Sequence, residues 1–345
     1  MTYYSGAFAP PSSTSRAKVC GIITLFTTLT AIVASRGHDR PTVSDAQAAG
    51  TIASAGTISK SSSYRGVLTF ATPGNGDPFA PGVIEELDLE SGEISVKFDG
   101  LDPSRSRTGE VAFVSRLAPG LYADHAIVVA DSRGVPGPQL FVCKRYSYNN
   151  DRHCGSPKLS GDGRRVAFTT RGGGGSVCEN NYRMKWGDYV VVRDRRGGEV
   201  ARFEGYTAPE WLPDGRLLMM GTQCRRAGVW VANASLRSLS RIDGDQVNVP
   251  AWAPAASPDG RRLAFVLSNQ LWQLSLTGRP ELTQLTHLPK SVMAATWSPD
   301  GGALALLTYD VTMPIRSLVL FRPGDERSMT VRPLPLYPYG PLSWR

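Results

Sequence analysis

The sequence predicts an all-β protein, a six-bladed β-propeller, and three observations lead to this fold. A turn motif, S-P-D-G or a close variant, recurs along the chain, a short apolar strand follows each copy, and the matching strands are about 41 to 55 residues apart. Repeats of this length with several strands each are typical of propeller blades. From Tyr64 onward, short apolar segments alternate with Gly, Pro, Asp and Asn, which favours strands over helices.

The turn motif explains how each repeat begins. Proline sets φ to about −65°, aspartate can accept hydrogen bonds from nearby backbone N–H groups, and glycine accepts a positive φ. Four copies contain the turn: Ser160–Phe168, Leu212–Met219, Ser257–Phe265 and Ser298–Leu306. Two degenerate copies keep the strand without its turn: Arg65–Phe70 and Glu110–Ser115. We match the strands at Leu68, Ala112, Ala167, Met219, Ala264 and Ala305.

Each repeat is expected to contain four strands. In one unit these are Ala208–Leu212, Arg216–Gly221, Gly228–Asn233 and Arg237–Asp243. The first unit, near Arg65, lacks an innermost strand, whereas Pro341–Arg345 (PLSWR) resembles Ala294–Ser298 (AATWS), a segment that precedes a turn. We therefore expect the C-terminal strand to complete the first blade and close the ring, which leaves no exposed sheet edge at the junction.

The N-terminal segment predicts export. Arg16 and Lys18 precede an uncharged apolar run of fifteen residues, Val19 to Val33. This length suits the core of a signal peptide and is shorter than the roughly 20 residues of a spanning helix. We interpret 1–35 as a signal peptide or short N-terminal membrane anchor, 36–63 as a flexible linker rich in Ser, Ala, Gly and Thr, and 64–345 as the propeller. The expected location is secreted or extracytoplasmic.

The S-P-D-G-x-x-L-A-F units resemble the PD40, or WD40-like, propeller repeats of the TolB family, from about residue 64 to residue 345. The resemblance implies a propeller that binds partners outside the cytoplasm; the periplasmic family member is part of an envelope-spanning system. TolB proteins carry an α/β domain before the propeller, where this chain has a short linker, so the resemblance does not extend to that domain. Similar repeats form the propellers of prolyl-oligopeptidase-type peptidases, but the sequence lacks a G-x-S-x-G nucleophile elbow.

The cysteines predict disulfide bonds. The predicted propeller contains an even set of four cysteines: Cys143, Cys154, Cys178 and Cys224. In an oxidising compartment such a set favours disulfides over metal or redox chemistry. We favour the pairs Cys143–Cys154 and Cys178–Cys224; the two other connectivities and free thiols stay open. The sequence has no C-x-x-C motif, and its four histidines lie in separate segments. We therefore expect neither a metal site nor a cofactor.

Loop length distinguishes the two rims of the predicted ring. Because blade strands are antiparallel, the turns joining strands one to two and three to four share one rim, which we interpret as structural. The longer loops share the opposite rim, here named the loop rim, and binding residues tend to lie on loops held by a rigid scaffold. Its basic and aromatic side chains suit carboxylates, phosphates or sugar rings, and the candidate ligand-binding residues are Arg145, Tyr148, Arg152, Tyr182, Arg183, Trp186, Arg225 and Arg226. Alternatively, the aromatic rings pack the loop bases and the arginines are solvated.

The net charge of +8 and the pI of about 9.4 favour anionic partners, and export argues against nucleic acid. The repeated aspartates (Asp162, Asp214, Asp259 and Asp300) are explained by the turn, so we assign no catalytic residue. We predict a monomeric, non-catalytic scaffold that binds a protein partner or an anionic cell-envelope polymer, with membrane contact only through an uncleaved N-terminal segment. The alternative is a propeller hydrolase or lyase acting on a polysaccharide, with carboxylates or histidines converging on the central channel.

Overall fold

The computed structural model describes residues 64–73, 82–106, 108–117, 124–143, 153–171, 188–222, 226–310, 316–334 and 339–345. The expected signal segment and linker lie outside these residues. In the part of the chain that is described, we find no helix with the length and apolar character needed to span a membrane.

The described residues form six four-stranded antiparallel sheets, each of which is one blade. From its innermost strand outward, the first blade contains β24 (Tyr339–Trp344), β1 (Val67–Pro73), β2 (Gly82–Asp88) and β3 (Ile94–Asp99). The second contains β4 (Leu101–Arg105), β5 (Val111–Arg116), β6 (His125–Ala130) and β7 (Pro136–Cys143). The third contains β8 (His153–Leu159), β9 (Arg165–Arg171), β10 (Asp188–Asp194) and β11 (Glu199–Glu204).

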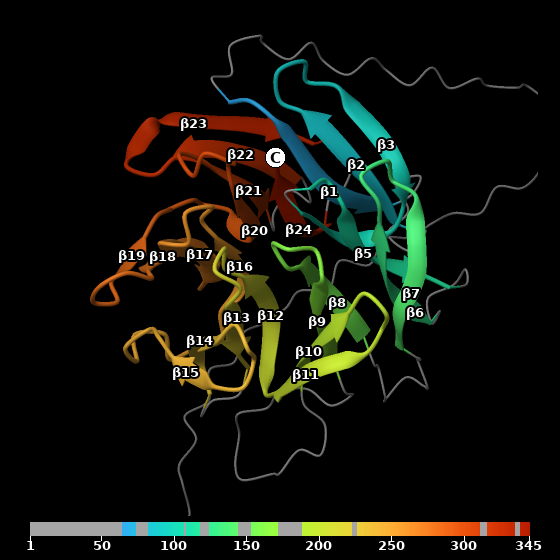
Figure 1. Ribbon diagram of the computed structural model, residues 1–345. Coiled ribbons are helices and arrows are strands. Elements are labelled where there is room, and N and C mark those ends of the chain that lie inside the picture. Colours follow the sequence, from blue (N-terminus) through green and yellow to red (C-terminus); the bar gives the residue numbers. More distant parts are fainter. Residues whose placement is uncertain are drawn as a thin grey trace, which may run out of the picture. The chain divides into compact units, whose positions relative to one another are not determined.

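The remaining three blades follow the same order. The fourth contains β12 (Tyr206–Trp211), β13 (Leu217–Gly221), β14 (Gly228–Ala232) and β15 (Leu239–Arg241). The fifth contains β16 (Trp252–Ala256), β17 (Arg262–Leu267), β18 (Gln270–Ser275) and β19 (Leu282–Gln284). The sixth contains β20 (Ser291–Trp297), β21 (Leu304–Tyr309), β22 (Arg316–Arg322) and β23 (Asp325–Pro333). The blades form a ring, and each innermost strand contacts the innermost strand of the next blade (Figure 1). The predicted six-bladed propeller is confirmed.

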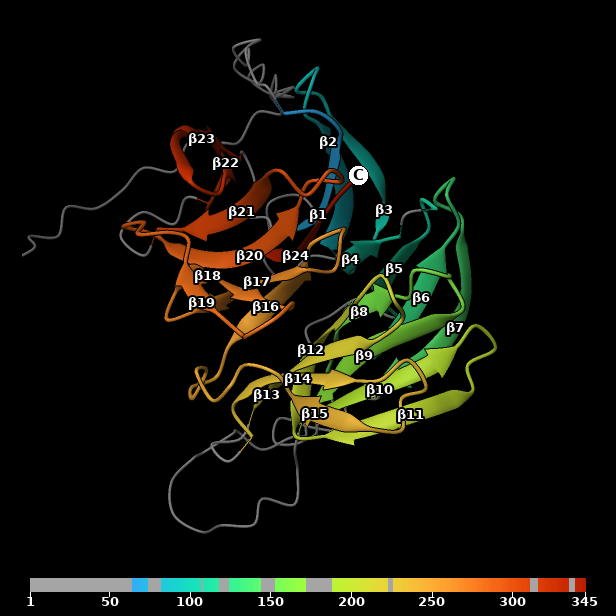
Figure 2. The same ribbon diagram turned by 60° about the vertical axis from the view of Figure 1, so that its left-hand side comes forward.

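The ring closes through the C-terminal strand, as the sequence predicts. Strand β24 lies between β20 of the sixth blade and β1 of its own blade (Figure 2). Leu68 is opposite Trp344, and Val67 and Arg345 exchange backbone hydrogen bonds of 2.8 and 3.1 Å. The first blade therefore combines the two ends of the propeller sequence in one sheet.

Apolar residues pack between neighbouring blades. Successive side chains of a strand point to opposite faces of its sheet. In β17, Leu263 and Phe265 join the cluster shared with the fourth blade, whereas Ala264 and Val266 join the cluster shared with the sixth. The run of apolar residues after each turn motif thus supplies both faces of a buried strand.

The S-P-D-G turns adopt the predicted conformation. In the fifth blade the Gly260 N–H donates to the Ser257 carbonyl at 2.8 Å, and Gly260 has a φ of 70°. The Asp259 carboxylate accepts the Arg261 N–H at 3.0 Å and also accepts the Ser257 hydroxyl. The hydroxyl in turn accepts the Arg262 N–H at 2.9 Å, so serine and aspartate hold the turn together.

Two details of the repeat alignment differ from the sequence analysis. The second blade was expected to lack the turn, but Ser106–Glu110 forms it, with Thr108 in the place of aspartate and its hydroxyl 2.8 Å from that of Ser106. Strand pairing also shifts two of the matched positions by one residue. The residue equivalent to Ala264 is Leu218 in the fourth blade, where we expected Met219. In the first blade it is Thr69, where we expected Leu68. Both errors come from aligning repeats in which the turn is shortened or changed.

Most innermost strands contain a bulge beside the channel. A residue with φ of 48–50° is followed by proline in four of them: Asp102, Ser156, Ala208 and Ala253. In β24, Gly340 has a φ of 80° and precedes Pro341. Proline in a sheet is confined mainly to edges and bulges, because it cannot donate to the ladder. These X-Pro bulges are not among the features predicted from the sequence.

Candidate functional site

The predicted ligand-binding residues of the loop rim lie, except for Arg226, outside the described residues: Arg145, Tyr148, Arg152, Tyr182, Arg183, Trp186 and Arg225. Arg226 is exposed, but its guanidinium donates to the carbonyl of Glu204 and lies 5.6 Å from the centroid of the Tyr206 ring. Arg226 therefore links the third and fourth blades. The proposed site on the loop rim stays a prediction.

One predicted disulfide is confirmed. Cys143 ends β7 and Cys154 lies in β8, with their α-carbons 6.0 Å apart, so the bond joins the second and third blades. Both cysteines are buried. Cys178 and Cys224, the second predicted pair, lie outside the described residues.

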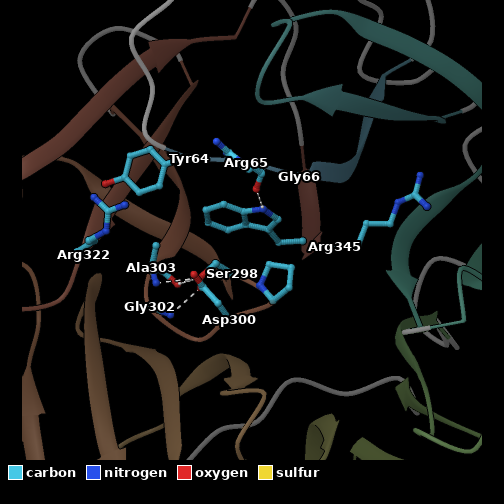
Figure 3. Close-up of a pocket in the computed structure, with 11 residues that line it drawn as sticks. Tyr64, Arg65, Gly66, Ser298, Asp300, Gly302, Ala303, Arg322 and Arg345 are labelled. Carbon is cyan, nitrogen blue, oxygen red and sulfur yellow. Dashed lines mark hydrogen bonds between the residues drawn. The ribbon is translucent and has the colours of Figure 1, made fainter.

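A pocket of about 340 Å³ opens on the rim of short turns, between the sixth and first blades (Figure 3). We name it the seam pocket. Its walls come from the S-P-D-G turn of the sixth blade, the end of β22 and the two chain segments that close the ring. It is lined by Tyr64, Arg65, Gly66, Ser298, Pro299, Asp300, Gly302, Ala303, Arg322, Trp344 and Arg345. From the sequence we predict only structural turns on this rim, and no site.

The seam pocket is open because an arginine of the repeat is replaced. Arg262 crosses from the fifth blade to the sixth, where it donates to the Gly301 carbonyl at 2.8 Å and lies 4.3 Å from the centroid of the Trp297 ring. Ala303 is the residue of the sixth blade that is equivalent to Arg262. The backbone of Ala303 forms hydrogen bonds with Ser298, and the backbone of Arg262 forms the same hydrogen bonds with Ser257. A methyl group at this position leaves space beside the next tryptophan, Trp344.

The tryptophan of the seam pocket also differs from its equivalents. The indole N–H groups of Trp211 and Trp297 donate, each at 3.0 Å, to backbone carbonyls of the preceding blade. Trp344 instead donates to the carbonyl of Arg65 in its own blade at 2.8 Å, and Tyr64 lies edge-on to it at 6.2 Å between ring centroids. The two rings form the aromatic part of the pocket wall.

The charged side chains of the seam pocket differ in the contacts that they make. The Arg322 guanidinium lies 5.0 Å from the Tyr64 ring centroid, and the Arg345 guanidinium points away from the turn, toward Glu86 at 3.6 Å (Figure 3). The Ser298 hydroxyl, the Gly302 N–H and the charge of Arg322 lower the pKa of Asp300, so this carboxylate stays ionised within its turn. Arg65 is exposed, and its guanidinium has no hydrogen-bond or ion-pair partner among the described residues.

The central channel carries a second group of polar residues. A narrow cavity of about 30 Å³ is lined by the innermost strands. Beside it the Asp102 carboxylate accepts the Ser156 N–H at 3.1 Å, and a β-carbon at Gly340 would lie 2.4 Å from its Oδ1. Loss of solvation raises the pKa of Asp102. Lys158 and Glu210 form an ion pair of 2.7 Å between the third and fourth blades.

The fold and its closure define the protein as a six-bladed β-propeller. Its structure is similar to that of TolB from Acinetobacter baumannii, at 14% identity and a TM-score of 0.62, over 81% of this chain and 66% of that one. It is also similar to a chain of a nidogen/laminin complex (13%, TM-score 0.50, 81% and 97% covered) and to hydrazine synthase of Kuenenia stuttgartiensis (14%, 0.52, 81% and 47%). At these identities the likeness shows the fold alone, and the chain spans less than two thirds of the TolB chain.

No protein-family model matches the sequence, and no curated protein matches it.

Proposed function

We propose that the protein is an exported, non-catalytic propeller scaffold that binds a protein partner or an anionic envelope ligand. The observation that carries this proposal is the seam pocket, where the Arg322 guanidinium lies 5.0 Å from the Tyr64 ring centroid and Arg65 lines the same wall as Trp344. Guanidinium groups and aromatic faces together recognise carboxylates and other planar anions. The similarity to TolB supports a scaffold, and the disulfide supports a place outside the cytoplasm.

The repeated aspartates favour binding over catalysis. The pKa values of Asp162, Asp259 and Asp300 are lowered, chiefly because each carboxylate accepts the hydroxyl of its own turn serine. A general acid needs a raised pKa, and a nucleophile needs access to substrate. These carboxylates serve the turn, and the ring separates them.

The second candidate is a propeller hydrolase or lyase acting on a polysaccharide. Asp102 favours it, because its pKa is raised and it lies beside the central channel, as a general acid would. Hydrazine synthase, an enzyme by name, is similar in fold. This reading predicts that Asp102→Asn abolishes turnover of a glycan.

A capture experiment separates the two functions. The full-length protein, purified from an oxidising compartment, is immobilised and incubated with exported proteins and envelope polymers at low and high salt. Arg65→Ala with Arg322→Ala tests the seam pocket, and Arg183→Ala with Arg225→Ala and Arg226→Ala tests the loop rim. Arg133→Ala is the control, since its side chain is 85% exposed on another turn.

The scaffold function is supported if capture is sensitive to salt, is abolished by the substitutions in one of the two sets of arginines, and occurs without turnover of the captured ligand. The set that abolishes capture then identifies the rim that binds the ligand. Turnover of a glycan that Asp102→Asn abolishes would replace the scaffold by the enzyme. Capture that survives both sets of substitutions would contradict the assignment of binding to either group of arginines.

A further inference from the structure

We propose that the seam pocket binds the free C-terminal carboxylate of a peptide whose last residue is aromatic or large and apolar. The proposal rests on the scaffold function and deepens it by naming the part of a protein partner that is recognised.

The size of the seam pocket suits the end of a chain. At about 340 Å³ it is near the lower end of the range for small-molecule pockets, roughly 300–1,000 Å³. This volume holds one or two residues of a peptide. A polymer bound through its middle would need a long open groove, whereas this pocket lies between the S-P-D-G turn and the chain segment at Tyr64 and has a volume of about 340 Å³ (Figure 3).

The wall of the seam pocket is largely apolar. Trp344, Tyr64, Pro299 and Ala303 contribute rings or methyl groups to it. The fifth-blade seam shows what such a wall accepts, since the Trp297 ring there is covered by the side chain of Arg262. Ala303 does not extend over Trp344 as Arg262 extends over Trp297, so a flat or bulky apolar side chain of a ligand can pack here against the exposed Pro299 and the small exposed parts of Trp344 and Tyr64.

The charges select an anion and not a cation. A ligand guanidinium would imitate Arg262, but it would meet Arg65 and Arg322 at the pocket, and the nearby Asp300 carboxylate is already engaged by its turn. A carboxylate is attracted by both arginines and can accept paired N–H donors from a guanidinium fork. A terminal residue combines one carboxylate with one apolar side chain on the same carbon, which matches this arrangement.

The pocket is also well ordered for binding. Trp344 is held by its hydrogen bond to the Arg65 carbonyl and by the backbone bonds between Val67 and Arg345. The opposite wall is the S-P-D-G turn, fixed by Ser298 and Asp300. Groups held in place before binding lose little entropy when the ligand arrives.

The test uses fluorescence polarisation of short labelled peptides with the full-length protein. The probe ends in phenylalanine with a free carboxylate, and the matched probes carry a C-terminal amide or end in serine. We expect the free acid to bind at least about tenfold more tightly than either matched probe, because both lose one of the two recognised groups. Equal binding of the acid and the amide would overturn the proposal.

Two substitutions test the site itself. Ala303→Arg places in the pocket the residue that Arg165 and Arg262 provide in other blades, so it should exclude the apolar group of the acid probe and weaken its binding by about tenfold or more. The melting temperature of the variant shows whether the fold is kept. Arg322→Ala changes an exposed side chain, keeps the fold, and should reduce the preference for acid over amide. Arg133→Ala should leave binding unchanged.

Normal binding by Ala303→Arg and by Arg322→Ala would overturn the proposal. A uronate oligosaccharide that binds at the pocket when no peptide does would also overturn it, in favour of an acidic glycan. If Ala303→Arg leaves capture of an envelope partner intact, the scaffold function stands and only the inference about the chain end is wrong.

Discussion

Arg105 and Glu86 form an ion pair that joins the second blade to the first, with side chains that are 8% and 6% exposed. Burial, with a contribution from the charge of Arg345, lowers the pKa of Arg105 to about 10, which leaves the guanidinium charged at neutral pH. Arg105 has the position that Trp211 and Trp297 have in the fourth and sixth blades, directly before the turn. A buried charge pair thus takes the place of an indole ring at this seam.

Removing one partner of this pair should be costly. We expect Arg105→Ala to lower the free energy of unfolding by about 3 kcal/mol, because Glu86 stays buried without its main partner. The value is at the lower end of the usual range since Lys97 Nζ lies 3.2 Å from the same carboxylate. Urea denaturation measures the change, and Arg133→Ala serves as the exposed control. Replacing both Arg105 and Glu86 by leucine should cost less than Arg105→Ala, and a larger loss would contradict the explanation.

The closure of the ring predicts a second sensitive position, Gly66. It has a φ of 103°, and a β-carbon there would lie 2.2 Å from the carbonyl oxygen of Arg345. We expect Gly66→Ala to destabilise the protein by about 2 kcal/mol or more, because strain at a positive φ adds to the clash with the closing strand. Gly161→Ala is the matched control, since a β-carbon there meets no atom within 4 Å. Equal unfolding midpoints for the two variants in urea would contradict this prediction, because they would show that the chain around Arg345 can move to accommodate the new β-carbon without loss of stability.

The fold was predictable because its signals are local and repeated. In the third, fifth and sixth blades the serine, aspartate and glycine of the turn hold it by themselves, so the motif predicts a hairpin where these residues occur. Closure by the C-terminal strand followed from counting strands and from the likeness of PLSWR to AATWS. The second-blade turn was missed because Thr108 supplies a hydroxyl where the other turns have a carboxylate.

The seam pocket could not be predicted in the same way. The change from RRLAF to GALAL after the turn is visible in the sequence, but its effect depends on where Arg262 reaches in the neighbouring blade. The X-Pro bulges of the innermost strands were equally visible and had no meaning until those strands were aligned around the channel. The loop-rim cluster rests on chain segments outside the described residues, so the structure describes only its Cys143–Cys154 disulfide and the contacts of Arg226.

The disulfide between Cys143 and Cys154 should stabilise the junction of the second and third blades. We expect Cys143→Ser with Cys154→Ser to lower the free energy of unfolding by about 2–3 kcal/mol, because the short loop between the two cysteines gains freedom in the unfolded chain. Thermal unfolding with and without reductant provides the measurement. Reductant should lower the melting temperature of the unmodified protein because it breaks the Cys143–Cys154 bond. The variant lacks this bond, so the same loss should be absent from it. An unmodified protein that melts identically in both conditions would contradict a stabilising role.

Asp102 predicts a pH dependence of opposite sign to that of the turn aspartates. Its pKa is raised in the folded protein by loss of solvation, so ionisation is unfavourable to folding and this contribution to stability is lost as pH rises through the folded pKa. The pKa values of Asp162, Asp259 and Asp300 are lowered, so their contribution is present above about pH 4 and is lost as pH falls further. The two effects can therefore be separated by substitution.

We expect Asp102→Asn to melt at a higher temperature than the unmodified protein near neutral pH, because the amide oxygen still accepts the Ser156 N–H and no charge is buried beside the channel. The difference should shrink as pH falls through the raised pKa of Asp102, because the carboxyl of the unmodified protein then takes up a proton. Asp259→Asn should show the reverse, a loss near neutral pH that disappears in acid. The turn aspartates are shared by Asp102→Asn and the unmodified protein, so their titration cancels in the comparison. A loss of melting temperature in Asp102→Asn that is largest near neutral pH and disappears in acid would contradict this prediction. It would mean that the contact with Ser156 stabilises the carboxylate more than burial disfavours it.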